Sequence, residues 1–120
     1  MLDNKLLGEF KRNITEYIDT FMSCNTAFIK VDKAFVKSHF EEAGKKVTNE
    51  HGKESNDYVC GDLQFSYDKD TEDVTEVILF PSYYDDNLGY YNGEDYIDLT
   101  DKYGEYGAEV LKAAKAKGWS

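Results

Sequence analysis

Two apolar runs flank a charged turn at residues 62–80, which read DLQFSYDKDTEDVTEVILF. The apolar residues of the first run alternate with polar ones: Leu63, Phe65 and Tyr67. This period of two predicts a strand with one buried face. The second run, residues 74–80, ends in consecutive apolar residues, which is typical of a more deeply buried strand. The polar segment between the runs is short, so we expect an antiparallel hairpin. Pro81 has no backbone N–H and is expected to end the second strand.

The N-terminal segment of the chain, before this hairpin, has helical periodicity. From residue 2 to residue 22 the apolar side chains recur mainly at steps of three and four, which predicts one amphipathic helix. Its apolar stripe is expected to pack on the hairpin rather than to mediate dimerisation; it consists of Leu6, Phe10, Ile14, Tyr17 and Phe21. Residues 28–31 fit either a strand or a connector. A second helix should begin after Asp32 as N-cap and stop at Gly44, a residue suited to a left-handed C-cap.

The rest of the chain contains turn signals and one more helix. Gly89 is a turn signal, and Asn92-Gly93 is predicted to close a small second hairpin. A last helix is expected through residues 103–114.

The predicted N-cap of this last helix is Thr100 or Asp101, and Gly118 should end it. Gly104 and Gly107 are expected to weaken its first turns by about 1 kcal/mol each relative to Ala. The expected fold is a single α+β domain of residues 1–120. In it, an antiparallel β-hairpin or small sheet packs against an N-terminal amphipathic helix, a second helix and a C-terminal helix.

Charge is the most distinctive feature of the composition. The 120 residues include 24 acidic and 14 basic side chains, for a net charge of −10. Residues 62–109 hold fourteen of the acids but only two basic residues, Lys69 and Lys102. This balance argues against a general nucleic-acid binder, which needs a basic surface. An apolar fraction of 41% with 15% aromatic residues argues against a disordered chain.

Tyrosines are interleaved with these acids. Seven of the ten tyrosines lie at residues 83–106, within this segment: Tyr83, Tyr84, Tyr90, Tyr91, Tyr96, Tyr103 and Tyr106. Tyrosine supplies rigid contact area with a polar tip, and carboxylates steer a cationic partner toward it. The predicted partner-binding residues are therefore Tyr83, Tyr84, Asp85, Asp86, Tyr90, Tyr91, Glu94, Asp95, Tyr96, Asp98 and Asp101.

The pattern favours a small acidic inhibitor that binds and neutralises a basic protein. An immunity protein for a toxin such as a nuclease, or a phage-type inhibitor of a nucleic-acid-handling defence protein, would fit. The alternative is a non-enzymatic module that binds a small molecule or peptide in a tyrosine-lined pocket. A subunit of a larger assembly is a third hypothesis. A simpler interpretation also stays open, in which the acids promote solubility and the tyrosines pack on their own sheet.

Sites for metals, cofactors or catalysis are not expected. Residues 68–73 resemble the start of an EF-hand loop, but Asp73 occupies the glycine position and Leu79 the position of the bidentate Glu. A looser cation site among four aspartates, Asp85, Asp86, Asp95 and Asp98, is a weaker interpretation than a solvated surface. His39 is expected to be partly buried and His51 exposed, with neither in a catalytic pattern. Motifs for phosphate binding or nucleophilic catalysis are missing, so we expect no enzyme activity.

Location is predicted from the cysteines and the apolar runs. Cys24 and Cys60 permit one disulfide by parity, but we expect two reduced, buried thiols. No apolar run approaches the roughly 20 residues that span a bilayer, and residues 1–5 do not resemble a signal peptide. A cytoplasmic protein is expected.

Overall fold

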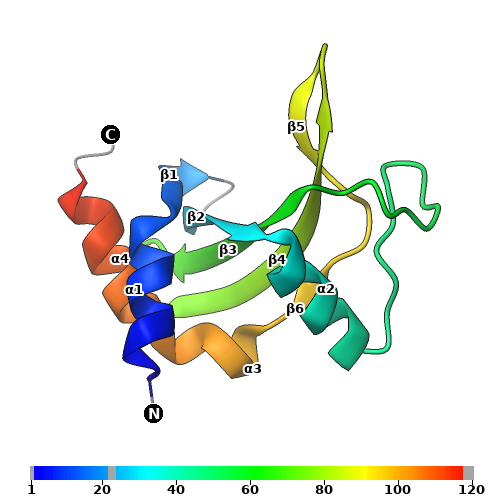
Figure 1. Ribbon diagram of the computed structural model, residues 1–120. Helices are drawn as coiled ribbons and strands as arrows, with labels where there is room; N and C mark the ends of the chain where they lie inside the picture. The colour runs from blue at the N-terminus through cyan, green and yellow to red at the C-terminus, as the bar shows by residue number, and fades with distance from the viewer. Residues whose placement is uncertain (1, 22–23, 118–120) are drawn as a thin grey trace. The chain divides into compact units, whose positions relative to one another are not determined.

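The computed structural model describes residues 2–21 and 24–117 and has the expected α+β class. Its helical segments are α1 (Asn4–Arg12), α2 (Lys33–Glu42), α3 (Thr100–Tyr103), the 3-10 turn η1 (Gly104–Tyr106) and α4 (Gly107–Ala116). Its strands are β1 (Ile14–Phe21), β2 (Cys24–Asp32), β3 (Cys60–Asp68), β4 (Val74–Asp85), β5 (Gly89–Asn92) and β6 (Ile97–Asp98). The strands form one sheet in the order β1-β2-β3-β4-β5, and β6 also pairs with β4 (Figure 1). Among the described residues, no helix is both long enough and apolar enough to traverse a bilayer.

The chain divides into two compact units. The first comprises Met1–Lys30, Gln64–Ile78 and Asp98–Ser120, and the second comprises Val31–Leu63 and Leu79–Ile97. Strands β3 and β4 each supply residues to both units. Whether the chain behaves as a single domain stays a prediction.

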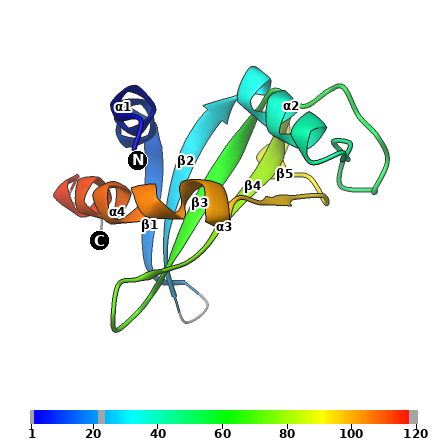
Figure 2. The same ribbon diagram turned by 90° about the horizontal axis from the view of Figure 1, so that it is seen from below.

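The core of the first unit is built around Phe10 of α1. Its ring makes edge-on contacts with Phe65 at 6.1 Å and with Tyr103 and Tyr106, both at 5.6 Å between centroids. Helices α1 and α4 pack side by side over this cluster (Figure 1 and Figure 2). Strand β3 contributes Tyr67, which is fully buried and donates a hydrogen bond from its hydroxyl to the Gly107 carbonyl at 2.7 Å. The period-two prediction for this strand is confirmed.

The predicted helix over residues 2–22 is wrong in its second half. Helix α1 ends at Arg12, and residues 14–21 form strand β1. This segment is rich in β-branched side chains, which favour a strand. The pairing with β2 shifts register between Ile14 and Glu16, so that Ile14 and Tyr17 are both buried although they lie three residues apart. This bulge reproduces on a strand the spacing expected of a helix. Residue 22 lies outside the described residues.

Three residues of the predicted N-terminal apolar stripe, Phe10, Ile14 and Tyr17, are buried, whereas Leu6 is only half-buried. Phe10 packs on Phe65 of β3, as expected of a stripe that faces the hairpin.

Helix α2 of the second unit was predicted correctly. The Asp32 side chain accepts a hydrogen bond from the Phe35 N–H at 2.8 Å. At the other end Gly44 has φ +68°, the left-handed conformation expected of a glycine that follows a helix.

Strand β4 is longer than predicted because Pro81 does not end it. The strand continues to Asp85, and Pro81 is fully buried within it. The ladder between β4 and β5 ends at the Ser82–Asn92 pair, and beyond it the Pro81 carbonyl accepts a hydrogen bond from Gly93 N–H at 2.9 Å. The proline nitrogen therefore lies where that ladder stops, and its missing donor breaks no further pair.

The second hairpin also differs from the prediction. Gly89, at φ +75°, follows the tight turn between β4 and β5, whereas Asn92-Gly93 ends β5 and closes no hairpin. Gly93 is buried, and a Cβ on it would lie 2.3 Å from the Thr48 carbonyl oxygen. It is a glycine because another backbone segment passes close by.

The last helix is broken into α3, η1 and α4 around the two glycines that were expected to weaken it. The prediction of Thr100 or Asp101 as N-cap is wrong. The residue before the helix is Leu99, and the Asp98 side chain accepts from Thr100 N–H at 2.9 Å instead. The predicted end at residue 118 lies outside the described residues.

Candidate functional surface

The β4–β5 hairpin sorts its four tyrosines onto two faces. Tyr83 pairs with Tyr91, and Tyr84 pairs with Tyr90. Because neighbouring side chains on a strand point to opposite faces, each pair occupies its own face of the hairpin. The hairpin projects from its unit (Figure 1), so one of these faces lies open.

Tyr83 and Tyr91 form the inner face. Tyr83 is buried, and its hydroxyl donates to the Thr48 carbonyl at 2.6 Å. Its ring stacks on that of Tyr91 with 5.6 Å between centroids. Burial raises the pKa of Tyr83 to about 12. This face anchors the hairpin to the loop that follows α2.

Tyr84 and Tyr90 form the outer face. They are 53% and 58% exposed, and their rings meet edge to face at 5.1 Å. Leu88, in the turn between the strands, is 69% exposed. We call Tyr84, Leu88 and Tyr90 the hairpin patch. Among the described residues, the other strongly exposed large apolar side chains are Val59 and Tyr96, which belong to the same unit.

The electrostatic environment of the hairpin is negative. Residues 82–92 contain Asp85 and Asp86 and no lysine or arginine. The pKa of Tyr91 is raised, first by burial and then by the negative charges of Glu50, Asp85 and Asp57. Carboxylates from three segments of the chain therefore act on the same hairpin.

Several of the predicted partner-binding carboxylates have structural roles. Asp85 accepts hydrogen bonds from the N–H groups of Asn87 and Leu88 and so shapes the turn. Asp95 lies 3.4 Å from the Lys45 ammonium. The hydrogen bonds from Thr100 lower the pKa of Asp98 below its usual range.

Asp86, Glu94 and Asp101 are exposed and have no side-chain hydrogen bond or ion pair to any described residue. Of the predicted carboxylates, these three are the best placed to meet a partner without disturbing the fold.

The predicted tyrosine-rich surface is divided between the units. Asp98 and Asp101 belong to the first unit, whereas the other nine predicted partner-binding residues belong to the second. Tyr103 and Tyr106 lie in the core around Phe10 and are not surface residues. Tyr96 is half exposed and lies against Phe80, with centroids 5.9 Å apart.

Sequence reasoning missed Leu88. Its signal is a single apolar residue within the polar turn between two tyrosine pairs.

The other candidate sites have local structural explanations. Asp68 caps its own turn by accepting from Asp70 and Thr71 N–H groups, and these bonds lower its pKa. The described residues contain no group of three or more His, Cys, Asp or Glu side chains placed to hold a metal ion. His39 is buried with Nδ1 2.8 Å from the Phe35 carbonyl oxygen, and His51 is exposed beside Glu50, as predicted for both histidines.

Cys24 and Cys60, the two cysteines of the chain, are free and form no disulfide with each other. Cys60 is buried, as expected, whereas Cys24 is only half-buried, with its sulfur 3.8 Å from the Thr26 hydroxyl.

Comparison of the chain with protein-family models, curated proteins and solved structures finds no match. The hairpin patch and the charges around it are therefore the features from which we infer the function.

Proposed function

We propose that this protein is a non-enzymatic inhibitor that binds a basic protein partner through the β4–β5 hairpin. The observation that carries the proposal is the hairpin patch itself, in which Tyr84, Leu88 and Tyr90 are exposed on a hairpin whose only charged side chains are acidic. Exposed apolar side chains that cluster in this way are typical of interaction sites.

Short-range affinity would come from the two tyrosines and the leucine. Tyrosine is enriched among residues that dominate binding energy, because its ring buries a large area while few torsions are immobilised. Tyr84 and Tyr90 already contact each other, so part of the ordering cost is met before a partner arrives. The stacked Tyr83–Tyr91 pair beneath them supports the hairpin in this conformation.

The choice of partner would come from charge. A negative hairpin on a chain of net charge −10 accelerates encounter with a basic protein and slows encounter with an acidic one. Association should therefore slow as ionic strength rises. A nuclease toxin or another nucleic-acid-handling protein has a basic surface that contacts phosphates, and the inhibitor would meet it in the cytoplasm.

The test is affinity capture from nuclease-treated lysate of the native host, followed by titration with the purified captured protein. The patch variant combines Tyr84→Ser, Leu88→Ser and Tyr90→Ser. The matched control is Val59→Ser, which removes exposed apolar area from the same unit outside the hairpin. We expect the patch variant to bind at least about 30-fold more weakly, since hot-spot residues contribute about 2 kcal/mol or more.

A second pair of variants tests the contribution of the hairpin charge. Asp86→Asn removes one hairpin charge, and Asp70→Asn removes one charge from the turn between β3 and β4. Only the first should slow association. Unchanged binding of a folded patch variant would disprove the proposal, and equal effects of the two aspartate variants would show that overall charge alone steers the partner.

A further inference from the structure

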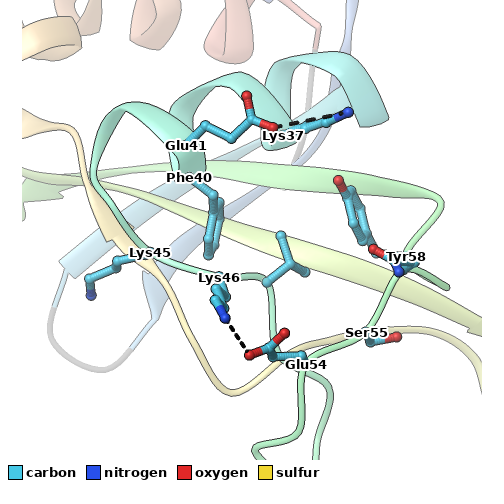
Figure 3. Close-up of a pocket in the computed structure, with 10 residues that line it drawn as sticks. Lys37, Phe40, Glu41, Lys45, Lys46, Glu54, Ser55 and Tyr58 are labelled. Carbon is cyan, nitrogen blue, oxygen red and sulfur yellow. Dashed lines mark hydrogen bonds and ion pairs between the residues drawn. The ribbon is translucent and has the colours of Figure 1, made fainter.

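A hollow in the second unit, between helix α2 and the loop that follows it, is poorly suited to hold a ligand (Figure 3). Its volume is about 480 Å³, but Phe40 and Tyr58 in its wall are almost fully buried and present little apolar surface to an occupant. At its edge Lys46 and Glu54 pair with each other at 2.8 Å. The predicted partner-binding residues and the hairpin patch all lie outside this hollow. Recognition by this unit is therefore better served by its projecting hairpin.

The hairpin patch is convex. The β4–β5 hairpin projects from its unit (Figure 1), and Leu88 in its turn is the most exposed of the large apolar side chains in the described residues, at 69%. Tyr84 and Tyr90 form the outer pair nearest to the turn. A flat partner surface would touch only the tip or one face of so narrow an element. A specific interface usually buries about 800 Å² on each partner. The hairpin approaches such an area only when the walls of a cleft enclose it.

Contacts at both ends keep the hairpin in shape for insertion into a cleft. On the inner face, the Tyr83 hydroxyl donates to the Thr48 carbonyl at 2.6 Å, and its ring stacks on Tyr91. At the tip, the Asp85 side chain accepts hydrogen bonds from two backbone N–H groups of the turn, at 2.8 and 3.1 Å. Because these contacts exist before a partner arrives, little conformational entropy is lost when the walls close around the hairpin.

Charge at the tip restricts which cleft can receive it. Asp85 and Asp86 directly precede the turn residues Asn87 and Leu88. A second copy of this chain, docked tip to tip, would bring like charges together. A cleft with cationic walls and an apolar floor satisfies both the carboxylates and the leucine. Proteins that bind nucleic acid have such clefts, in which basic side chains contact phosphates and apolar or aromatic side chains contact bases.

We propose that the β4–β5 hairpin inserts tip first into the nucleic-acid-binding cleft of its basic partner and so inhibits that partner by competition. Asp85 and Asp86 face the cationic side chains that otherwise contact phosphates. Leu88, Tyr84 and Tyr90 cover the apolar surface that otherwise contacts bases. This inference rests on the proposed function and adds to it the part of the partner that is blocked.

The first test is displacement of nucleic acid from the purified captured partner. Fluorescently labelled single-stranded DNA, duplex DNA and single-stranded RNA, each of about 20 nucleotides, are bound to the partner, and the parent protein is titrated in at constant ionic strength. We expect fluorescence anisotropy to show complete release of the nucleic acid that the partner binds most tightly. The patch variant should release it at least about 30-fold less effectively. Val59→Ser should act like the parent protein.

The second test distinguishes insertion of the tip from contact along one face of the hairpin. Leu88→Ala removes apolar area at the tip alone, and the fold should be unaffected because this side chain is so exposed. Val59→Ala removes an exposed apolar side chain elsewhere in the unit and is the control. A leucine enclosed by a cleft contributes at least about tenfold to affinity, so Leu88→Ala should lose that factor. The control should lose less than about twofold.

A complex that holds partner, nucleic acid and parent protein together would overturn this inference. A captured partner that binds none of the three nucleic acids would overturn it too, as would a loss below about twofold for Leu88→Ala. If the patch variant still loses affinity in those cases, the proposed function stands and only the place of insertion is wrong. If the patch variant binds like the parent protein, both are wrong. Dimerisation of the parent protein that the patch variant abolishes would assign the hairpin to a second copy instead.

Discussion

Replacing Tyr67 with Phe removes one hydroxyl from the core of the first unit and nothing else. That hydroxyl donates to the Gly107 carbonyl at 2.7 Å, from a side chain that is fully buried. A hydrogen bond of this kind contributes about 1 kcal/mol net. At about pH 7 we therefore expect Tyr67→Phe to unfold with a free energy about 1 kcal/mol lower than that of the parent protein.

The same hydroxyl makes this difference depend on pH. Burial, and then the nearby Tyr17, raise the pKa of Tyr67 far above its ordinary value of 10.0. Above about pH 10 the unfolded chain releases this proton while the folded chain retains it, so the parent protein loses about 1.4 kcal/mol of stability per pH unit from this group. The Phe variant has no such proton. Its disadvantage of about 1 kcal/mol should vanish between about pH 10 and pH 11, and its stability should exceed that of the parent at higher pH.

Urea unfolding followed by far-ultraviolet circular dichroism, at steps from about pH 7 to pH 11, measures both free energies. The other tyrosines ionise in both proteins, so their effects cancel in the difference. A difference that stays constant over this range would refute the reasoning, since it would mean that the Tyr67 hydroxyl ionises equally in both states. Equal stability at neutral pH would show that the hydrogen bond to Gly107 adds nothing.

Three further substitutions test the packing and capping of the fold. Gly93→Ala should lower the free energy of unfolding by about 1–3 kcal/mol, because its Cβ would lie 2.3 Å from the Thr48 carbonyl oxygen. Gly104→Ala, whose Cβ meets its nearest atom only at 4.0 Å, is the matched control, and an equal loss in both would contradict the close approach. Phe10→Ala should cost about 3–5 kcal/mol in chemical denaturation, and a loss below about 1 kcal/mol would show that its aromatic cluster does not organise the core. Asp98→Ala removes the hydrogen bonds that the Asp98 carboxylate accepts from the N–H and hydroxyl of Thr100, and it should cost about 0.5–1.5 kcal/mol at neutral pH. Since the folded pKa of Asp98 is lowered, this stabilisation is present above the ordinary carboxyl pKa and disappears as the pH falls through the folded value, so parent and variant should converge in acid-titrated thermal unfolding.

The elements that could be predicted from sequence depend on contacts within a few residues. The alternation at Leu63, Phe65 and Tyr67 predicts β3 correctly because successive side chains of a strand point to opposite faces of the sheet. Helix α2 begins after Asp32 and ends before Gly44, because the cap bond of Asp32 and the left-handed conformation of Gly44 act locally.

The predictions that the structure contradicts failed because they depend on contacts between different segments of the chain. Residues 14–21 have helical spacing, but the bulge opposite β2 turns that spacing into a strand. Pro81 continues a strand because the neighbouring ladder ends there, and Gly93 is required by the Thr48 carbonyl rather than by a turn. Each outcome depends on another segment of the chain that is brought alongside only when the chain folds.

For the candidate surface, too, the sequence predicts some properties and only the fold decides the others. Composition and order already establish an acidic segment rich in tyrosine, from which we infer the class of partner that we propose. They do not distinguish Tyr83 from Tyr84, or Asp85 from Asp86, because neighbouring residues share the same local sequence. Strand register buries Tyr83 and exposes Tyr84, and the turn engages Asp85 while leaving Asp86 in solvent. Exposure is a property of what covers a side chain, and the segments that cover it are brought there only when the chain folds.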